Sequence, residues 1–327
     1  MTSTIRFTQL PDRLQFEDSA FPLAINSHDN PTAADNLTDW VKTHKTTLEA
    51  ELSRHGVILF RGFPINNAES FDAFAAAFDY PSFTYQESLS NAVRINYTPR
   101  VFTANEAPPE VEIYLHHEMA QTPISPDKLF FFCKSAADSG GATPVCRSDL
   151  LFAAIQAQQP KLASEFEQKG LKYTTAMPAE DDVLSGQGRS WKSTLSVHTA
   201  TEAEAKLREL GYTWVWQADG TLSATTPVLP AVRDLGGSTK SFYNQLIAAY
   251  LGWEGVQEDP ARAVTFGDGS KIKANDLATI VTLAKQFTYD LAWQDGDVAL
   301  VDNKLAMHGR RPFSGKRKRQ VLVALAA

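Results

Sequence analysis

The chain has 327 residues, of which 43% are hydrophobic and 21% are charged, which is ordinary globular composition. Its formal net charge of −7 and isoelectric point near 5.5 argue against nucleic acid or anionic lipid as partners. The two cysteines, Cys133 and Cys146, do not suggest a disulfide framework. The N-terminus has no signal-peptide core, and no apolar stretch has the length of a membrane span. We therefore expect a soluble cytoplasmic protein without nucleic-acid or membrane partners.

The first half of the chain predicts a mixture of helices and strands. An apolar stripe predicts a helix over 35–55, with Gly56 at its C-terminal end. Periodicity predicts a second helix over 67–78 and strands over 56–63, 111–121 and 128–136.

The second half predicts a mixed insert followed by further strands. Surface helices are expected at 148–158 and 201–211, the second with Thr201 as N-cap and Gly211 as C-cap. The remaining predictions are a hairpin over 212–226, a helix over 275–287 capped by Asn275, and strands over 296–308 and 320–326. Strands at both ends fit an elaborated all-β core better than a parallel α/β sheet.

Two histidines and a glutamate are adjacent in "YLHHEMAQ" (114–121). Side chains alternate between the two faces of a strand, so His116 and Glu118 should share one face while His117 points away. A third ligand must come from elsewhere. His308 is the best of the five other histidines, because it follows a buried strand and opens a basic segment. On their own, these residues do not favour a metal site. A His-x-Glu pair on a strand is more often a surface pair or a hydrogen-bonded polar pair.

Two imidazoles and one carboxylate around one ion form the facial triad of non-haem Fe(II) oxygenases, which leaves positions open for a co-substrate and O₂. A zinc hydrolase uses the same ligand types, and a metal-free binding protein could share the fold. The basic segment "GRRPFSGKRKR" (309–319) is mostly a solvated turn, but one of its arginines could face inward as an anion receptor.

Two longer stretches carry a resemblance to a known family: "LHHEMAQTPISPDKLFFFCKSAADSGGATPV" (115–145) and "WQDGDVALVDNKLAMHGRRPFSGKRKRQVLVAL" (293–325). They resemble the two metal-bearing segments of the TauD/TfdA superfamily of Fe(II)/2-oxoglutarate dioxygenases. The His-x-Glu pair is similar to the SyrP-like and clavaminate-synthase-like branch. With the shorter motifs "HGVILFRGF", "GRSWKSTL", "FYNQ" and "FGDGSKI", the resemblance covers most of residues 50–327.

The resemblance implies a mainly β fold with peripheral helices. One dioxygenase domain, 1–327, would contain a double-stranded β-helix (jelly-roll) core and a helical and hairpin lid at about 165–260. The resemblance also implies roles for single residues. His116, Glu118 and His308 would bind Fe(II), and Thr143 and Arg319 would bind 2-oxoglutarate, with Arg317 as the competitor of Arg319.

The resemblance further implies hydroxylation of an unactivated C–H bond with O₂, releasing succinate and CO₂. Desaturation and cyclisation remain open, whereas Glu118 argues against halogenation because halogenases of the superfamily lack this carboxylate. The substrate would be an amino acid or a related small molecule, free or tethered to a carrier protein, in natural-product biosynthesis. Sulfonates and aryloxy acids are the alternatives.

Recognition of the primary substrate is expected from loops over the mouth of the site. Arg100 in the stretch 97–112 and Arg189 in the stretch 179–195 are suited to a substrate carboxylate. The family's "SW" and "NQ" motifs add Ser190, Trp191 and Asn244. The alternative roles are solvated charges for the arginines, and packing or capping for Trp191 and Asn244.

Overall fold

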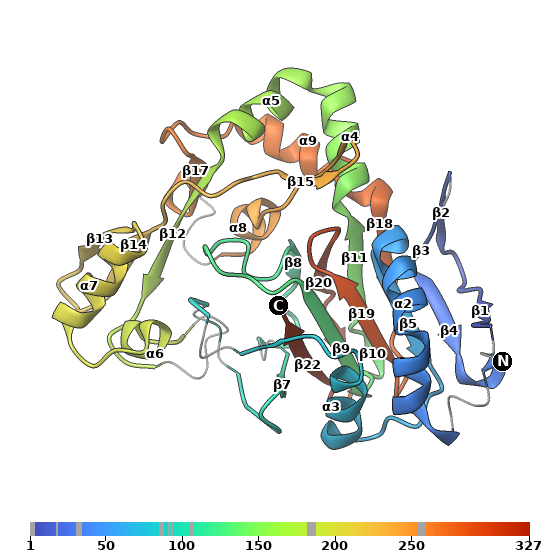
Figure 1. Cartoon of the computed structure of the whole chain (residues 1–327). Helices are drawn as coiled ribbons and strands as arrows, with labels where there is room; N and C mark the ends of the chain where they lie inside the picture. Colours follow the sequence, from blue (N-terminus) through green and yellow to red (C-terminus); the bar gives the residue numbers. More distant parts are fainter. Residues whose placement is uncertain are drawn as a thin grey trace.

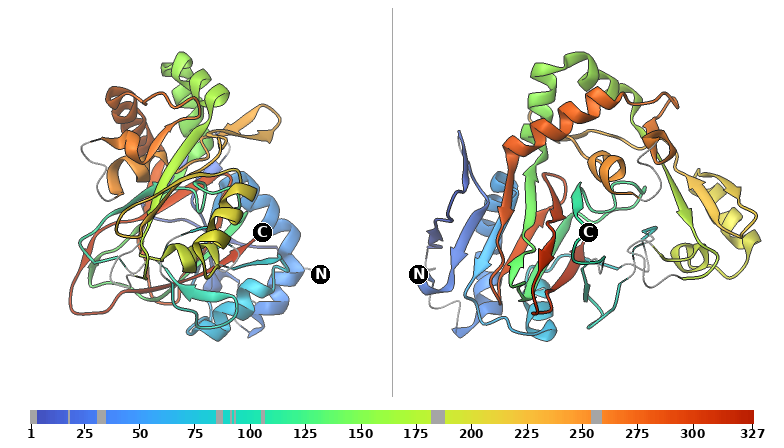
Figure 2. Two further views of the ribbon diagram at one scale, coloured as in Figure 1. Left: turned by 90° about the vertical axis from the view of Figure 1, so that its left-hand side faces the viewer. Right: turned by 180° about the vertical axis from the view of Figure 1, so that it is seen from behind.

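Two β-sheets pack face to face at the centre of the molecule, and helices cover the outer face of the larger one (Figure 1). A further sheet with its own helices extends away from this sandwich (Figure 2). The computed structural model describes residues 4–17, 19–30, 35–84, 88–90, 92, 94–104, 107–181, 188–253 and 259–327.

The larger sheet contains strands from both the N-terminal and the C-terminal part of the chain. Its pairings are antiparallel except for the parallel pair β4 and β5. In spatial order its strands are β1 (Phe7–Thr8), β4 (Leu23–Asn26), β5 (Val57–Arg61), β19 (Val298–Asp302), β9 (Lys128–Ser135), β22 (Gln320–Ala326) and β6 (Ser82–Phe83), with β7 (Val101–Thr103) also paired to β22.

The smaller sheet carries the metal-ligand candidates. Side chains of β9, β19 and β22 pack against those of β11, β18 and β20 in one buried cluster, so the two sheets form a sandwich. This is the jelly-roll core that the resemblance implied. The order is β18 (Thr288–Leu291), β11 (Thr143–Arg147), β20 (Ala306–Arg310) and β8 (Ile113–His116), all antiparallel.

Two N-terminal helices, both predicted from the sequence, cover the outer face of the larger sheet. Helix α2 (Leu37–His55) is capped by the Asn36 side chain and ends at Gly56, whose φ of +75° favours glycine. Helix α3 (Ala68–Ala76) begins with a capping box formed by Asn67 and Ser70. Their buried faces join Phe60, Phe130 and other sheet residues in one apolar cluster.

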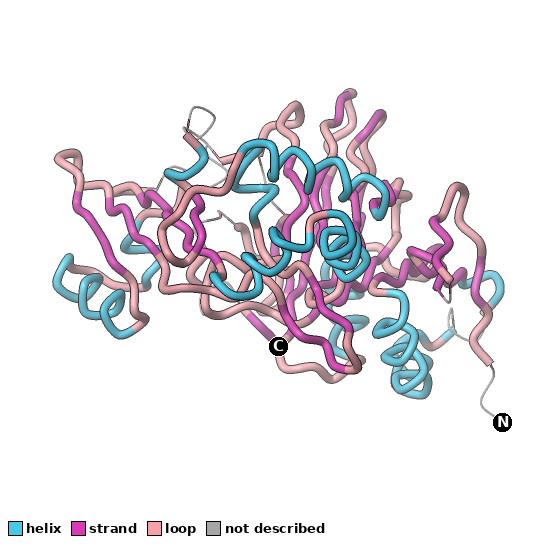
Figure 3. Tube along the Cα trace, turned by 90° about the horizontal axis from the view of Figure 1, so that it is seen from above, coloured by secondary structure: helices cyan, strands magenta, loops and turns pink. Residues whose placement is uncertain are grey.

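The middle of the chain forms the projecting part. The predicted hairpin is present as β13 (Thr213–Trp216) and β14 (Leu222–Thr225), which extend a sheet with β12 (Leu171–Met177) and β17 (Val264–Phe266). Figure 3 shows the hairpin and its helix at one end of the molecule and the N-terminal strands at the other. The helices here are α4 (Ser148–Gln158), α5 (Pro160–Lys169), α6 (Trp191–Leu195), α7 (Ala200–Glu209), α8 (Leu246–Gly252) and α9 (Ala274–Ala284).

Short elements complete the described fold. They are the strand pairs β2 (Leu14–Phe16) with β3 (Ser19–Phe21), β10 (Ser139–Gly140) with β21 (Phe313–Ser314) and β15 (Arg233–Gly236) with β16 (Thr239–Ser241), and the 3₁₀ turns η1 (Ser27–Asp29), η2 (Pro260–Arg262) and η3 (Lys285–Phe287). Of the helices in the described ranges, none combines the length and apolarity needed to cross a bilayer.

Two predicted helix caps were wrong. Helix α7 is capped by Thr199 and not Thr201, because Thr199 and Glu202 form the reciprocal capping box. Helix α9 begins one residue before Asn275, and Lys273 in the cap position makes no side-chain cap bond. The helix at 148–158 is not a surface helix either, since Leu151, Phe152 and Ile155 are fully buried.

The predicted strand over 111–121 is shorter than expected, because β8 ends at His116. Beyond it, the buried side chain of Asn303 holds the chain. Its Oδ1 accepts from the Glu118 N–H at 2.8 Å, and its Nδ2 donates to the carbonyls of Glu118 and Pro126. The Asn303 carbonyl also accepts from His117 Nδ1. Asn303 therefore replaces the missing strand pairing and fixes the backbone on which Glu118 stands.

We expect Asn303→Leu to lower the free energy of unfolding, because it buries the N–H and C=O of Glu118 without partners. Each unpaired buried group costs about 1–3 kcal/mol. Urea unfolding measures the change, and Asn275→Leu on the exposed start of α9 is the control. Equal stability of the two variants would contradict this role of Asn303.

Candidate metal centre and adjoining cavity

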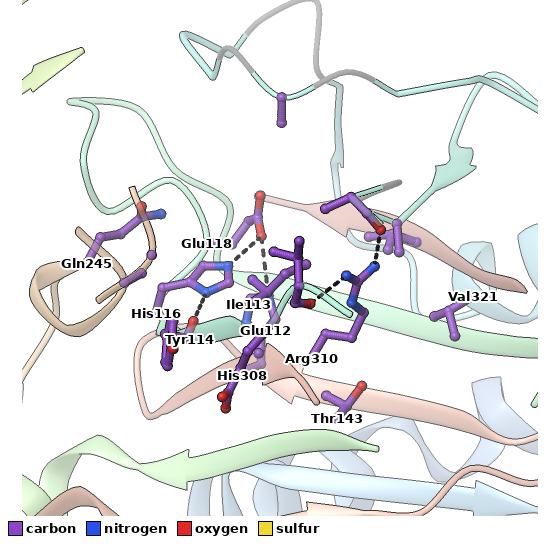
Figure 4. Close-up of a pocket in the computed structure, with 18 of the residues that line it drawn as sticks. Glu112, Ile113, Tyr114, His116, Glu118, Thr143, Gln245, His308, Arg310 and Val321 are labelled. Carbon is purple, nitrogen blue, oxygen red and sulfur yellow. Dashed lines mark hydrogen bonds and ion pairs between the residues drawn. The ribbon is translucent and has the colours of Figure 1, made fainter. Parts of the chain in front are cut away.

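The antiparallel pairing of β8 and β20 places His116 directly opposite His308. Their rings lie 4.3 Å apart between centroids. The Glu118 carboxylate lies over both, with Oε2 at 3.4 Å from His308 Nε2 and 3.8 Å from His116 Nε2 (Figure 4). One donor atom from each residue lies within 4.8 Å of the other two. The structure thus brings together the three residues that the sequence singled out.

Hydrogen bonding and burial prepare these side chains to bind a cation. His116 Nδ1 lies 2.7 Å from the Tyr114 carbonyl, which can only accept, so Nδ1 donates to it and Nε2 is the ring nitrogen that faces Glu118. Burial lowers the pKa of His308 to about 4, helped by the charges of His116 and Arg94, so this imidazole is neutral at pH 7.

Glu118 is ionised in this setting. Burial works to raise its pKa, but the neighbouring His116 and His308 hold the pKa well below its usual range. The geometry alone would suggest an ion pair between His308 and Glu118. The low pKa of His308 shows instead a carboxylate facing neutral imidazole. A carboxylate and two imidazole nitrogens at these separations fit the facial triad of a divalent iron.

His117 points away from the cluster, as the alternation argument predicted. Its side chain is fully buried against the Tyr243 ring, and Nδ1 donates to the Asn303 carbonyl. Burial lowers the pKa of His117 to about 3, so it is a neutral packing residue.

A cavity of about 310 Å³ opens beside the three residues. It is lined by side chains of β8, β20, β22 and α8 and of the segments around 90–94 and 104–112, and it contains Thr143 and Arg319 as well as the cluster. The ring of Phe131 packs 5.0 Å from His308 and closes the inner side. The cluster therefore lines one side of this cavity.

Thr143 is buried at the start of β11, and its hydroxyl accepts a hydrogen bond from a neighbouring side chain. The Trp293 indole N–H donates to Thr143 Oγ1 at 2.9 Å. The hydroxyl proton of Thr143 therefore remains to be donated to an acceptor in the cavity. Sequence reasoning quoted Trp293 within a motif but gave it no role.

Arg319 lines the cavity, whereas Arg317 lies on the surface. Arg319 Nε donates to the Gly141 carbonyl at 3.0 Å, and a Cβ on Gly141 would come within 2.9 Å of this side chain. Gly141, two residues before Thr143, thus leaves room for Arg319. Arg317 instead pairs with Asp295 on the exposed turn. The geometry favours Arg319 over its competitor.

Arg310, two residues after His308, fixes one wall of the cavity (Figure 4). Its buried guanidinium donates to the carbonyls of Ala107, Pro108 and Val111 at 2.7–2.8 Å. The intervening Gly309 lies so close to β8 that a Cβ would come within 2.4 Å of the Ile113 carbonyl. Sequence reasoning did not single out Arg310.

None of the five residues predicted to bind the primary substrate is among those that line this cavity. Arg100 pairs with Asp72 of α3, and Arg189 donates to Ser90 and to Ser193 of α6. Ser190 caps α6, Trp191 packs against Trp216, and Asn244 bonds to the backbone at Ala231, Leu246 and His117. These side chains therefore make contacts within the protein away from the lining of the cavity. Part of the predicted 179–195 loop, residues 182–187, lies outside the described residues.

Other polar residues also line the cavity. Sequence reasoning missed Arg94, Glu112 and Gln121, and it noted Gln245 only as part of the "FYNQ" motif. Arg94 follows no recognisable pattern in "NAVRIN", so no signal in one sequence would have found it.

Comparison with known proteins agrees with this arrangement. The family described as "Taurine catabolism dioxygenase TauD, TfdA family" matches residues 25–325. A clavaminate synthase-like protein of Arabidopsis thaliana is 36% identical over 317 residues, which cover 95% of this chain and 96% of the relative. The dapdiamide synthesis protein DdaC of Enterobacter agglomerans is 27% identical over 281 residues, or 81% of each chain.

Solved structures share the fold at low sequence identity. A Burkholderia xenovorans protein described as an alpha-ketoglutarate dependent 2,4-D dioxygenase superposes with a TM-score of 0.52 at 16% identity, covering 98% of this chain and 97% of that one. A taurine dioxygenase of the same organism gives 0.50 at 16% identity, covering 87% and 80%. The family match selects the oxygenase over the zinc hydrolase and the metal-free binding protein. The chain belongs to the TauD, TfdA family and is an Fe(II)- and 2-oxoglutarate-dependent dioxygenase.

Proposed function

We propose that the enzyme hydroxylates an unactivated C–H bond of an amino acid or an amino-acid-derived small molecule. His116, Glu118 and His308 would hold the iron, and Thr143 and Arg319 would bind the distal carboxylate of 2-oxoglutarate. The observation that carries the proposal is that the three ligand candidates, Thr143 and Arg319 all line the same cavity.

Each of these residues has a defined task in the reaction. When bound, the iron and 2-oxoglutarate supply the oxidising chemistry, which consumes O₂ and releases succinate and CO₂. The two imidazoles and the carboxylate would hold the iron, and three protein ligands of these types would leave it able to bind a co-substrate. Arg319 and Thr143 orient the co-substrate through a guanidinium and a directed hydroxyl. The Phe131 ring shields His308 from water.

The walls of the cavity set the primary substrate in this proposal. The segment 107–112 and helix α8, with Gln245 and Trp253 at its ends, line the space beside the metal ligands. Within the predicted lid at 165–260, the α8 region is thus the part that faces the site. The similarity to a protein of dapdiamide synthesis supports a substrate from natural-product chemistry.

The proposal is tested by adding Fe(II) and 2-oxoglutarate without oxygen and recording visible absorption. A charge-transfer band is expected, because the keto acid must bind the iron directly. Amino acids, free and carrier-bound, are then screened with oxygen for substrate-dependent succinate release and for a hydroxylated product by mass spectrometry. Desaturated or cyclised products, or a response to sulfonates or aryloxy acids alone, would overturn the proposed reaction or substrate class.

Glu118→Ala and His116→Ala are expected to lose iron, since each removes one of three anchors. His117→Asn is the matched control, because an amide at this position still donates to the Asn303 carbonyl and lies outside the cluster. Iron content after anaerobic loading and desalting measures the effect. Iron loss from the His117 variant with retention in the His116 variant would contradict the assigned ligands.

Arg319→Leu is expected to raise the 2-oxoglutarate concentration required for half-maximal succinate release by about tenfold to hundredfold. A charged hydrogen bond contributes about 1.5–3 kcal/mol, and the iron content should not change. Arg317→Leu is the matched control, because it removes only an exposed ion pair. The opposite result would assign the co-substrate to Arg317.

A further inference from the structure

The tryptophan of the segment "WQDGD" (293–297) bonds to a residue of the cavity without lining the cavity itself. Trp293 Nε1 donates to Thr143 Oγ1 at 2.9 Å. Thr143 is among the residues that line the cavity, whereas Trp293 is not. An indole has one N–H donor and no acceptor, so this is the one hydrogen bond that the side chain of Trp293 can donate. Trp293 can therefore act on a ligand in the cavity only through the hydroxyl of Thr143.

The bond from Trp293 limits the directions in which the Thr143 hydroxyl can point its proton. A hydroxyl has one proton and two lone pairs, and it rotates to suit its partners. The indole N–H occupies one lone pair, so the proton must point elsewhere. Among the residues that the structure describes, none accepts this proton in a hydrogen bond. The proton is thus held available for an acceptor in the cavity.

The backbone on both sides of Trp293 is anchored by one arginine of the larger sheet. The Arg61 guanidinium, at the end of β5, donates to the carbonyl of Ala292 at 3.0 Å and to both carboxylate oxygens of Asp297 at 2.7–3.3 Å. Asp297 is fully buried, and buried charge-assisted bonds of this kind are strong. Arg61 therefore fixes the two ends of the segment 292–297, and with them the position of the indole.

We propose that Trp293 is a positioning residue for the co-substrate, because its indole N–H holds the Thr143 hydroxyl ready to donate to the distal carboxylate of 2-oxoglutarate. The inference rests on the proposed function and adds to it a residue that acts from outside the cavity. A hydroxyl that is already oriented has less freedom to lose when the ligand binds, so the ligand binds more tightly. The motifs "HGVILFRGF" and "WQDGD", which contribute Arg61 and Trp293, then serve the same carboxylate.

The test titrates the anaerobic Fe(II) enzyme with 2-oxoglutarate and follows the charge-transfer band, which reports binding and not turnover. Trp293→Phe keeps an aromatic ring but removes the N–H donor. We expect this variant to need about threefold to tenfold more 2-oxoglutarate for half of the full band. Pyruvate has the same keto acid end but no distal carboxylate, so its half-saturation concentration should not change. A general distortion of the iron site would weaken the binding of both keto acids.

A double variant shows whether the effect passes through Thr143. Thr143→Val removes the hydroxyl at nearly constant shape and should itself weaken the binding of 2-oxoglutarate. Adding Trp293→Phe to Thr143→Val should cause no further loss, because the indole then has no hydroxyl to hold. Trp216→Phe is the matched control, since it also removes a bonded indole N–H, but one that donates to Glu204 in the projecting part. It should leave the binding of both keto acids unchanged.

The results separate this inference from the proposed function. If Thr143→Val binds 2-oxoglutarate as well as the unmodified enzyme does, the proposed role of Thr143 fails and the inference fails with it. If Thr143→Val weakens binding but Trp293→Phe does not, only the inference is overturned. Equal weakening of 2-oxoglutarate and pyruvate in Trp293→Phe, loss of the band with both, or additive losses in the double variant would make Trp293 a general structural residue and would also overturn the inference.

Discussion

The geometry of the site depends on the side chain of Asn303, which connects two segments that are far apart in the sequence. One metal-ligand candidate, His308, lies within a strand, but Glu118 stands beyond the end of β8, where no neighbouring strand pairs with it. The amide of Asn303 bonds to both the N–H and the C=O of Glu118. A buried amide has two donors and two acceptor positions, so one side chain can pair with both backbone polar groups of a residue. The carboxylate is positioned by this bond network and not by the sheet.

The histidines of the site and the two residues proposed to bind the co-substrate come from different elements of the fold. The sheet pair β8 and β20 supplies the histidines, and the start of β11 and the turn before β22 supply Thr143 and Arg319. Glycines make the close approaches: Gly309 between the strands and Gly141 beneath Arg319. Motifs that are weak individually are therefore specific in combination, because Gly141 leaves room for Arg319 of the other segment and Gly309 allows β20 to approach β8.

Much of this could be predicted from the sequence, and the errors have physical causes. Alternation along 114–118 correctly separated His117 from its neighbours, although β8 ends before Glu118. Both Thr199 and Thr201 precede a glutamate by three residues, so the capping pattern cannot choose between them. The choice is made in space, where Glu204 accepts from the Trp216 indole and Glu202 remains for the cap. It was also not predictable that Arg100, expected to bind the primary substrate, would lie outside the cavity lining. It is held by Asp72, 28 residues away in sequence.

The attachment of the cavity wall by Arg310 has a consequence for how such an enzyme diversifies. The guanidinium donates to three main-chain carbonyls of residues 107–111, and these hydrogen bonds involve none of the side chains of that stretch. Amino-acid changes in this stretch would therefore leave this anchor in place beside the metal-ligand candidate His308. Selection can remodel the wall one side chain at a time while the oxidising centre keeps its geometry, so new substrate preferences can evolve without passing through inactive intermediates.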